Sequence, residues 1–387
     1  MTKQPSYRFA GYTESWEERK FGQLIRSIQT GTTLLGSEQN NGIPLLKMGN
    51  IQRGYWDLTK IERLEQEIES ENIVKYGDFI FNTRNTLELV GKGATWVLKN
   101  GIYGFNSNLA RVIFDGIDTI FFNYLYNIPN SISQVKARAV GTTSVAAVYP
   151  RDLYSINFSL PSLPEQTAIG SFFQDIDQII SLQQRKLEVL KEQKKTYLKL
   201  LFPAKGQKKP ALRFAGFEDD WKEVKLGEYC DIATGKLDAN AMVTDGEYDF
   251  YTSGIQKYKI DVAAFEGPAI TIAGNGATVG YMHYADGKFN AYQRTYVLSN
   301  FLVDRSFIYS EIGRKLPSKI QQEARTGNIP YIVMDMLTKL DICLPSLPEQ
   351  EVIGSFFQDL DKAIAKQEEK VNQLKESKQT LLRKMFI

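Results

Sequence analysis

The residues of this chain whose types best suit specific binding are basic and amide residues gathered at expected turns. Arginine and lysine hold phosphates and read guanine, while asparagine and glutamine form paired hydrogen bonds with adenine. Net charge is only +2, so any nucleic-acid surface must be a local concentration of such groups. Any one of them alone more often belongs to a solvated loop than to a specific contact. We select as candidate DNA-binding residues Lys47, Asn50, Gln52, Arg53, Arg84, Asn85, Lys92, Asn106, Asn108 and Arg111, and in the second half Gln256, Lys257, Asn275, Asn290, Tyr292, Gln293, Arg294, Arg325 and Asn328.

Two G-x-G-A-T strings, at 91–95 and 274–278, could suggest a nucleotide pocket. As a cofactor fingerprint the string is weak, because strand-like sequence follows it where a helix would be required. We interpret both as tight turns, and their offset of 183 predicts one shared structural element. A dinucleotide or S-adenosylmethionine pocket is the disfavoured alternative.

Other catalytic or metal-binding signals are weak. The N-I-P-Y string at 328–331 lacks one proline of the Asn-Pro-Pro-Tyr loop of adenine methyltransferases, so we interpret it as a loop. The single histidine, His283, sits in a strand-like run and is expected to be structural. Cys230 and Cys343 lie far apart and indicate neither a disulfide framework nor a zinc site. We therefore expect no catalytic residues, no metal and no cofactor in this chain.

The bulk composition is that of an ordinary globular protein. Of 387 residues, 43% are hydrophobic and 24% charged, and the length predicts two or three domains. No stretch approaches the roughly 20 apolar residues of a membrane span. Residues 1–5 lack the apolar core of a secretory signal, so a cytoplasmic protein is expected.

The chain contains an internal repeat that organises everything else. Residues 160–203 recur at 344–387, and about 25 of the 44 aligned positions are identical. Each half also opens on Arg-Phe-Ala-Gly, at 8–11 and 213–216, followed by Trp16 or Trp221. Two copies of one module therefore lie head to tail, which suits a protein that reads a two-part object or joins two identical partners.

The repeated segment is predicted to form a coiled coil. From 172 to 202, apolar residues alternate at spacings of three and four, and Leu-Pro-Glu-Gln marks the helix entry. An antiparallel pairing in which residue numbers sum to 561 would place each seam lysine opposite a glutamine, whereas a parallel pairing would face two lysines. We therefore predict an intramolecular antiparallel pair in which cysteines at 187 and 374 crosslink. The predicted seam comprises Gln183, Leu187, Leu190 and Lys194 against Gln367, Val371, Leu374 and Lys378.

The remaining sequence predicts an α+β protein with two mixed, β-rich domains. We expect the domains at 1–159 and 211–343, the helices at 160–203 and 344–387, and a basic linker at 204–210. Strands are expected at 43–48, 78–82, 94–98, 109–114, 248–252, 269–273, 278–284 and 295–299, and helices at 119–126, 131–139 and 305–324.

The ordered duplication of Arg-Phe-Ala-Gly, a variable β-rich segment, Leu-Pro-Ser-Leu-Pro-Glu-Gln and a long helix resembles the specificity subunits of Type I restriction-modification enzymes. The resemblance spans the whole chain. It implies two target recognition domains that each read half of a bipartite double-stranded DNA site, with a pseudo-two-fold coiled coil that spaces them and docks two methyltransferase (M) subunits. It also implies that adenine N6 methylation and S-adenosylmethionine binding belong to those partners, and that motor-nuclease (R) subunits join for restriction. Because the two domains are unlike, we expect an asymmetric site.

Two other functions remain open at this point. The chain could be a scaffold whose coiled coil assembles proteins while its β domains bind protein or carbohydrate. It could also be a self-contained methyltransferase, although that function requires a cofactor loop that we do not find.

Overall fold

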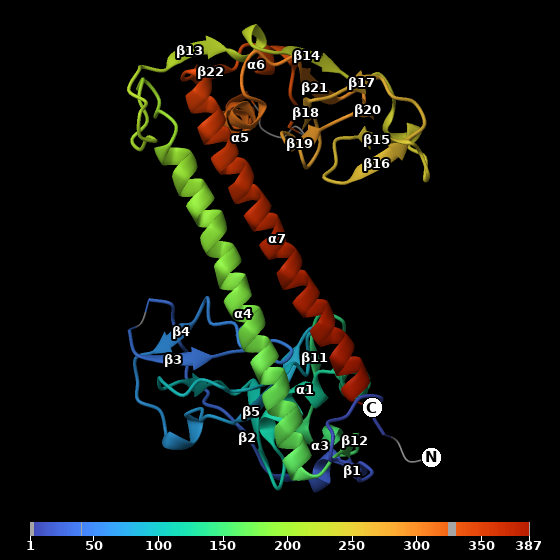
Figure 1. Cartoon of the computed structure of the whole chain (residues 1–387). Helices are drawn as coiled ribbons and strands as arrows, with labels where there is room; N and C mark the ends of the chain where they lie inside the picture. The colour runs from blue at the N-terminus through green and yellow to red at the C-terminus, as the bar shows by residue number, and fades with distance from the viewer. Residues whose placement is uncertain (1–3, 40, 324–329, 387) are drawn as a thin grey trace. The chain divides into compact units, whose positions relative to one another are not determined.

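The computed structural model describes residues 4–39, 41–323 and 330–386. They divide into two compact units (Figure 1). Unit 1 comprises Met1–Gln183 together with Lys370–Ile387, and unit 2 comprises Gln184–Glu369. Each of the two long helices, α4 (Leu163–Leu200) and α7 (Leu347–Met385), therefore contributes one part to each unit. The helices thus begin inside the predicted repeats, and the LPEQ entry is confirmed.

Unit 1 is a mixed α+β fold built on a four-stranded antiparallel sheet of order β2-β9-β5-β7. A second sheet, β4-β3-β8, contains one parallel pair, and the pair β1-β12 leads into α4. Its elements are β1 Glu17–Lys20, β2 Ile25–Thr30, β3 Ile43–Leu46, β4 Glu62–Leu64, β5 Phe79–Asn82, β6 Arg84–Asn85, β7 Gly93–Thr95, β8 Gly104–Phe105, β9 Leu109–Phe114, α1 Thr119–Tyr126, α2 Pro129–Lys136, β10 Val140–Gly141, β11 Ala146–Ala147, α3 Pro150–Leu153 and β12 Asn157–Leu160.

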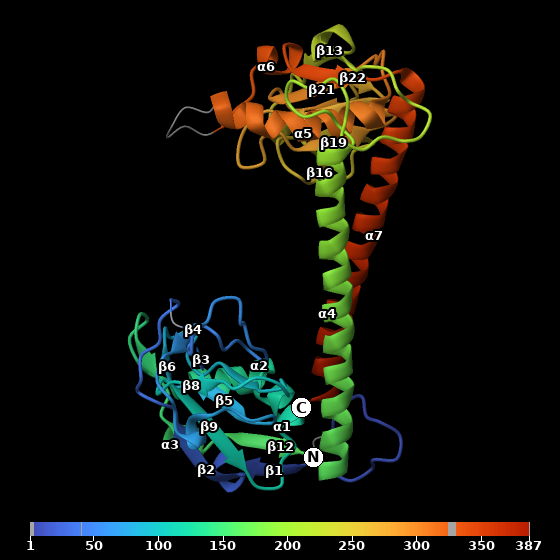
Figure 2. The ribbon, with the colours of Figure 1, turned by 90° about the vertical axis from the view of Figure 1, so that its left-hand side faces the viewer.

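Unit 2 repeats this topology with different sequence. Its sheet β14-β21-β18-β19 corresponds to β2-β9-β5-β7, the sheet β16-β15-β20-β17 also contains one parallel pair, and β13-β22 leads into α7. Its elements, all labelled in Figure 1, are β13 Lys222–Lys225, β14 Asp231–Thr234, β15 Tyr248–Tyr251, β16 Lys257–Ile260, β17 Phe265–Glu266, β18 Ala269–Ala273, β19 Met282–Ala285, β20 Lys288–Ala291, β21 Thr295–Ser299, α5 Arg305–Glu323, α6 Met334–Thr338 and β22 Asp341–Leu344. Figure 2 shows helix α5 of this unit from the side.

Most strand and helix predictions are confirmed, and two are corrected. Strand β7 ends at Thr95, and the side chains of Val97 and Leu98 are 43% and 42% exposed, so apolar character there did not indicate a strand. Strand β19 begins only at Met282, because 278–281 forms the turn before it. Ala324, at the expected end of α5, lies outside the described residues.

In each unit, α4 and α7 pack antiparallel, as predicted. In unit 1, Phe173 of α4 contacts Phe386, just beyond α7, and Lys378 forms an ion pair with Asp177. In unit 2, Lys194 pairs with Asp361 and Lys191 with Glu368. The seam positions of both helices are buried or half-buried, while most of the positions between them are exposed. The acidic partners of Lys194 and Lys378 were not foreseen, and the pairing of each lysine with a glutamine stays a prediction.

Both hydrophobic cores are completed by a residue from the end of a long helix. In unit 1, Phe386 is buried against Trp16, Phe121 and Phe173. In unit 2, Phe202 is buried against Trp221, Phe307 and Phe357. Burying a phenylalanine side chain typically stabilises a fold by about 1.5–3 kcal/mol, so both helix ends belong to the cores.

The close approach of α4 to α1 requires a glycine. A Cβ atom on Gly170 would lie 2.8 Å from the backbone nitrogen of Phe121, and one on Gly354 would lie 2.7 Å from that of Phe307. Backbone atoms cannot move aside cheaply, which explains why the repeat carries glycine at both positions.

Candidate nucleic-acid interface

Both units hold a loop and a turn together with the same backbone hydrogen bonds. In unit 1, Thr83 N donates to the carbonyl oxygen of Asn108 at 2.9 Å, and Val148 N donates to that of Thr83 at 2.9 Å. In unit 2, Gly274 N donates to Arg294 O at 2.8 Å, and Ile332 N donates to Gly274 O at 2.7 Å. The two units therefore share one platform, made of the loop after β5 or β18 and the turn before β9 or β21. Because backbone atoms form it, side chains on it can vary.

Among the described residues, unit 2 carries most of the exposed candidates, and two of them lie on its platform. Gln293 and Arg294 are exposed on the turn, and Gln256 and Lys257 are exposed beyond β15. The Asn275 side chain is half-buried, with its Oδ1 atom 2.6 Å from the Ser253 hydroxyl. The half-buried candidate Tyr292 shares this turn, while Arg325 and Asn328 lie outside the described residues.

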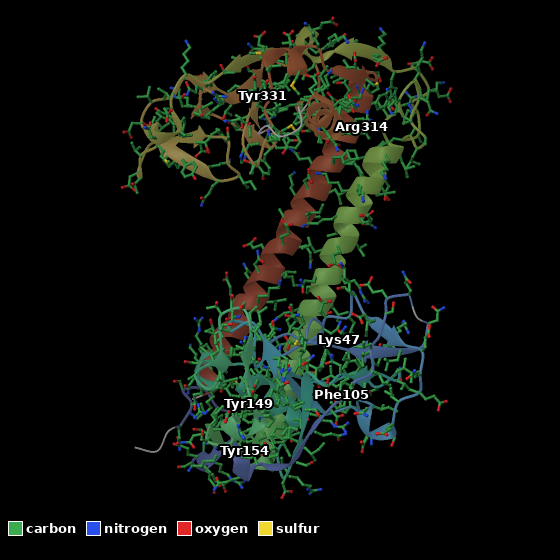
Figure 3. The ribbon with its side chains drawn as sticks, turned by 180° about the vertical axis from the view of Figure 1, so that it is seen from behind. Lys47, Phe105, Tyr149, Tyr154, Arg314 and Tyr331 are labelled. Carbon is green, nitrogen blue, oxygen red and sulfur yellow. The ribbon has the colours of Figure 1, made fainter. Side chains whose placement is uncertain are left out.

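The platform of unit 1 carries Arg84 and Asn85 on β6, next to the β10–β11 hairpin. Arg84 is exposed, whereas Asn85 and Asn108 are half-buried. Lys47 forms an ion pair with Glu62 at 2.6 Å, and its place in the unit can be seen in Figure 3.

A pair of cations lies beside this platform. The Lys92 ammonium donates to Gln52 Oε1 at 2.7 Å, and Arg53 donates to the carbonyl of Glu88 at 3.4 Å. Burial lowers the pKa of Arg53, and burial together with the nearby Arg53 charge lowers the pKa of Lys92. The Nη1 atom of Arg53 is buried without a hydrogen-bond partner among the described residues. Two like charges held together in this way favour an anion between or beside them.

Four candidates are structural residues. The Arg111 guanidinium is buried and donates to Asp78, to Gln29 and to two backbone carbonyls, so it is held inside the unit and is not presented to DNA. Asn50 and Asn290 are buried and brace loops through their amide groups. Asn106 is buried and accepts from the backbone of Asn108. We leave these four out of the proposed interface.

The two G-x-G-A-T strings do not form one shared element. Gly91 and Gly280 are equivalent, since each donates its N–H to the last residue of its strand, Asn82 or Ala273, and both have positive φ. The first string therefore closes its loop and enters β7, whereas the second opens the loop after β18. Their offset is a coincidence of composition.

One segment of each platform was not among the candidate residues predicted from the sequence. Leu87 N donates to Thr143 O, which brings the loop at 142–145 to the unit 1 platform. Tyr331 is 56% exposed and lies across an isolated bridge from Asn275 (Figure 3). The sequence indicates only a loop at 328–331, the segment that includes Tyr331. The repeat offset of 184 relates Val148 to Ile332 and could have indicated their equivalence.

The described parts of the chain show neither a metal-binding cluster nor a membrane-spanning helix. Within residues 4–39, 41–323 and 330–386, no three His, Cys, Asp or Glu side chains are placed to hold a metal ion. Within the same ranges, every helix is too short or too polar to cross a membrane.

The duplicated fold and its paired platforms define a two-module protein with one variable face on each module. The sequence matches the Type I restriction modification DNA specificity domain family over residues 13–192 and 218–376. Because these segments make up most of the chain, the protein belongs to the family of Type I restriction-modification specificity subunits.

Relatives support this assignment. The chain is 40% identical over 164 residues to the Type I restriction enzyme EcoDI specificity subunit of Escherichia coli, which covers 42% of this chain and 36% of that protein. It is 29% identical over 239 residues to the putative MjaX specificity subunit of Methanocaldococcus jannaschii, covering 58% and 55%. These matches span about a third and about half of the relatives' lengths. The MjaVIII specificity subunit of the same organism is 22% identical, over 95% and 91%.

Solved structures share the fold. The Type I restriction-modification S subunit from M. genitalium superposes with a TM-score of 0.70 at 16% identity, covering 100% of this chain and 99% of that one. A chain from a structural study of the assembly and conformational transition of the type I R-M system gives 0.53 at 18% identity, covering 98% and 99%.

Proposed function

We propose that this chain is the DNA-recognition subunit of a Type I restriction-modification complex, in which each unit reads one half of an asymmetric bipartite site. The observation that carries the proposal is the pair of platforms, one backbone frame with unlike side chains. An identical frame supports the same mode of approach to DNA in both units. Unlike side chains, such as Asn108 against Arg294, support different target bases and therefore a site without a palindrome.

The long helices, in this proposal, set the spacer between the half-sites and dock two methyltransferase subunits. Leu163 and Leu347 occupy equivalent positions of the repeat, and their side chains are 49% and 51% exposed. Large apolar side chains left open at equivalent positions favour two copies of one partner.

The chemistry, in this proposal, belongs to the partners. The methyltransferase subunits would bind S-adenosylmethionine and methylate adenine N6, and motor-nuclease subunits would join for restriction. The chain itself would act without a cofactor, as a cytoplasmic, non-catalytic subunit.

Salt-dependent binding of the purified full-length chain to duplex DNA tests the proposal. Phosphate contacts release counterions, so affinity should fall linearly on a logarithmic salt scale, with a slope set by the number of contacts. If the chain binds a protein or a carbohydrate and shows no salt-dependent binding to duplex DNA, a coiled-coil scaffold is favoured instead.

A second test is to map methylated adenines in the host genome with and without the gene. Loss of methylation at an interrupted, asymmetric sequence is expected. A continuous palindrome would contradict the proposed division of the site between two unlike units.

A further inference from the structure

Two positions on each platform can be equated between the units by their backbone contacts. Arg84 lies opposite Ala147 in the β6–β11 pair, and Asn275 lies opposite Tyr331 in an isolated bridge, where 147 and 331 differ by the repeat offset of 184. Asn108 and Arg294 are equivalent because each accepts the N–H of the first loop residue, Thr83 or Gly274. The loop position is thus 84 or 275, and the turn position is 108 or 294.

The two units carry the same two residue types at these positions, in exchanged order. Unit 1 has arginine on the loop and asparagine on the turn, whereas unit 2 has asparagine on the loop and arginine on the turn. The exchange is not needed to hold the frame, because the loop and turn are joined through backbone atoms in both units. The side chains at these positions are therefore free to serve a ligand.

The arginines at these positions are available to a ligand. Arg84 and Arg294 are exposed, and neither guanidinium forms an ion pair or hydrogen bond with another residue in the described part of the chain. Other arginines near the cores, such as Arg111 and Arg305, are engaged in internal ion pairs. Asn108 is half-buried, and Asn275 is steadied by Ser253, so both amides are less mobile than a free surface side chain.

The chemistry of the pair matches two neighbouring base pairs. Arginine pairs with the O6 and N7 atoms of guanine, and asparagine with the N6 and N7 atoms of adenine. Adjacent backbone segments are separated by about 4.8 Å, and successive bases by about 3.4 Å. Two side chains on adjacent segments therefore reach two neighbouring base pairs more readily than they reach a single base pair.

Building on the proposed DNA-reading function, we propose that Arg84 with Asn108, and Arg294 with Asn275, are specificity-determining pairs that each read one G·C and one neighbouring A·T pair. The guanine-reading group stands on the loop in unit 1 and on the turn in unit 2. The order of guanine and adenine across the platform is therefore reversed between the two half-sites.

Selection from a randomised duplex library by the full-length chain tests this inference. Arg84→Ala should cost roughly 5- to 150-fold in discrimination at one guanine position of one half-site. Arg294→Ala should do the same in the other half-site. Arg26→Ala is the matched control, since this exposed arginine lies near the start of β2 and pairs with Asp115, just beyond the end of β9 and away from the turn before it, and its loss should leave all base preferences unchanged.

The exchange variant Arg84→Asn with Asn108→Arg is the decisive arm. It gives unit 1 the order of unit 2, so guanine and adenine should trade places in one half-site while the other half-site stays as in the parent. Circular dichroism and thermal melting check that the variant is folded, and the reverse exchange at 275 and 294 repeats the test in unit 2.

The outcomes separate the inference from the proposed function. If the parent chain enriches no duplex, the DNA-reading function itself fails. If the parent selects a site but the exchange variants keep its base preferences, the specificity pairs are wrong and the function stands. If Arg84→Ala weakens binding to all sequences equally and lowers the salt slope by about 1, the arginine is a phosphate contact, which also overturns the inference.

Discussion

Arg8 donates two hydrogen bonds to the carboxylate of Glu165, at 2.6 and 2.7 Å, and this pair joins the two repeated motifs of the chain. Arg213 and Glu349 form the same bidentate pair in unit 2, at 2.7 Å for both bonds. In each unit the Arg-Phe-Ala-Gly motif therefore contacts the Leu-Pro-Glu-Gln motif, 157 residues away in unit 1 and 136 in unit 2. Both glutamate side chains are fully buried, and each has its arginine as ion-pair partner.

Removing one arginine should destabilise its own unit. Arg8→Ala leaves the buried Glu165 carboxylate without its countercharge, at an expected cost of about 3–5 kcal/mol to unit 1. Urea denaturation with hydrogen exchange resolved by unit measures it. Lys209→Ala is the control, because its partner Asp220 is well exposed and the loss should be below about 1 kcal/mol. Equal losses in both variants would contradict the structural role of Glu165.

The last described residue of the chain should stabilise unit 1. Phe386→Ala removes a ring that stacks on Phe121 at a centroid distance of 5.5 Å, with an expected cost of about 3–5 kcal/mol. Phe202→Ala is the matched variant and should destabilise unit 2 instead. Hydrogen exchange that shows the same unit weakened by both variants would disprove this division of the cores.

Lys92 should contribute to DNA affinity without setting base preference. Its folded pKa is lowered by burial and by Arg53, and a bound phosphate would restore it. Between that folded pKa and the unfolded value of about 10.5, the unfolded chain binds more protons, so the folded state gains stability as pH rises through this window. Over the same window DNA binding should weaken, because Lys92 loses its charge earlier than an ordinary lysine.

Lys92→Gln should remove this alkaline dependence and lower the salt slope of binding by about 1. Fluorescence anisotropy of labelled duplexes across pH and salt measures both effects. Lys99→Gln, a change at an exposed position, is the control. An unchanged salt slope for Lys92→Gln would rule out a phosphate contact at this lysine.

His283 should make unit 2 sensitive to acid. Burial is the main cause of its lowered pKa, and its ring lies 4.9 Å from that of Tyr281 and 5.3 Å from that of Tyr251. Its contribution to stability is complete above the unfolded value of about 6.5 and is lost as pH falls through the folded value. A tag-free sample has one histidine, so a single imidazole NMR signal reports the titration. A midpoint at or above 6.5 would contradict the burial, and His283→Gln should remove the acid dependence.

Local sequence patterns predicted the long elements well. Strands Leu109–Phe114, Ala269–Ala273 and Thr295–Ser299 and helix Thr119–Tyr126 match the predicted bounds, because each carries enough apolar residues to show its period. Strand Glu17–Lys20 was not predicted, since all four of its residues are exposed and only its pairing with Asn157–Leu160 makes it a strand. Such pairing joins residues too distant for any local pattern to record.

The sequence predicted the types of residue in the candidate site, but not which individual residues belong to it. Arg84 and Arg111 look alike in sequence, yet one is exposed and the other is buried in a network of four hydrogen bonds. The difference depends on where each residue lies in the folded unit and on the side-chain oxygens of Asp78 and Gln29, which accept hydrogen bonds from Arg111. These contacts join segments up to 82 residues apart.

The amino-acid sequence by itself determined the repeat, the long helices and their antiparallel direction. Apolar spacing can be recognised along each single helix, and the repulsion between two facing lysines depends only on how the two helices are paired. Only the tertiary structure decided that Arg84 corresponds to Asn275, and Asn108 to Arg294. Those equivalences are set by backbone hydrogen bonds between distant segments, which are indifferent to side-chain identity and therefore leave no trace in the residues that they position.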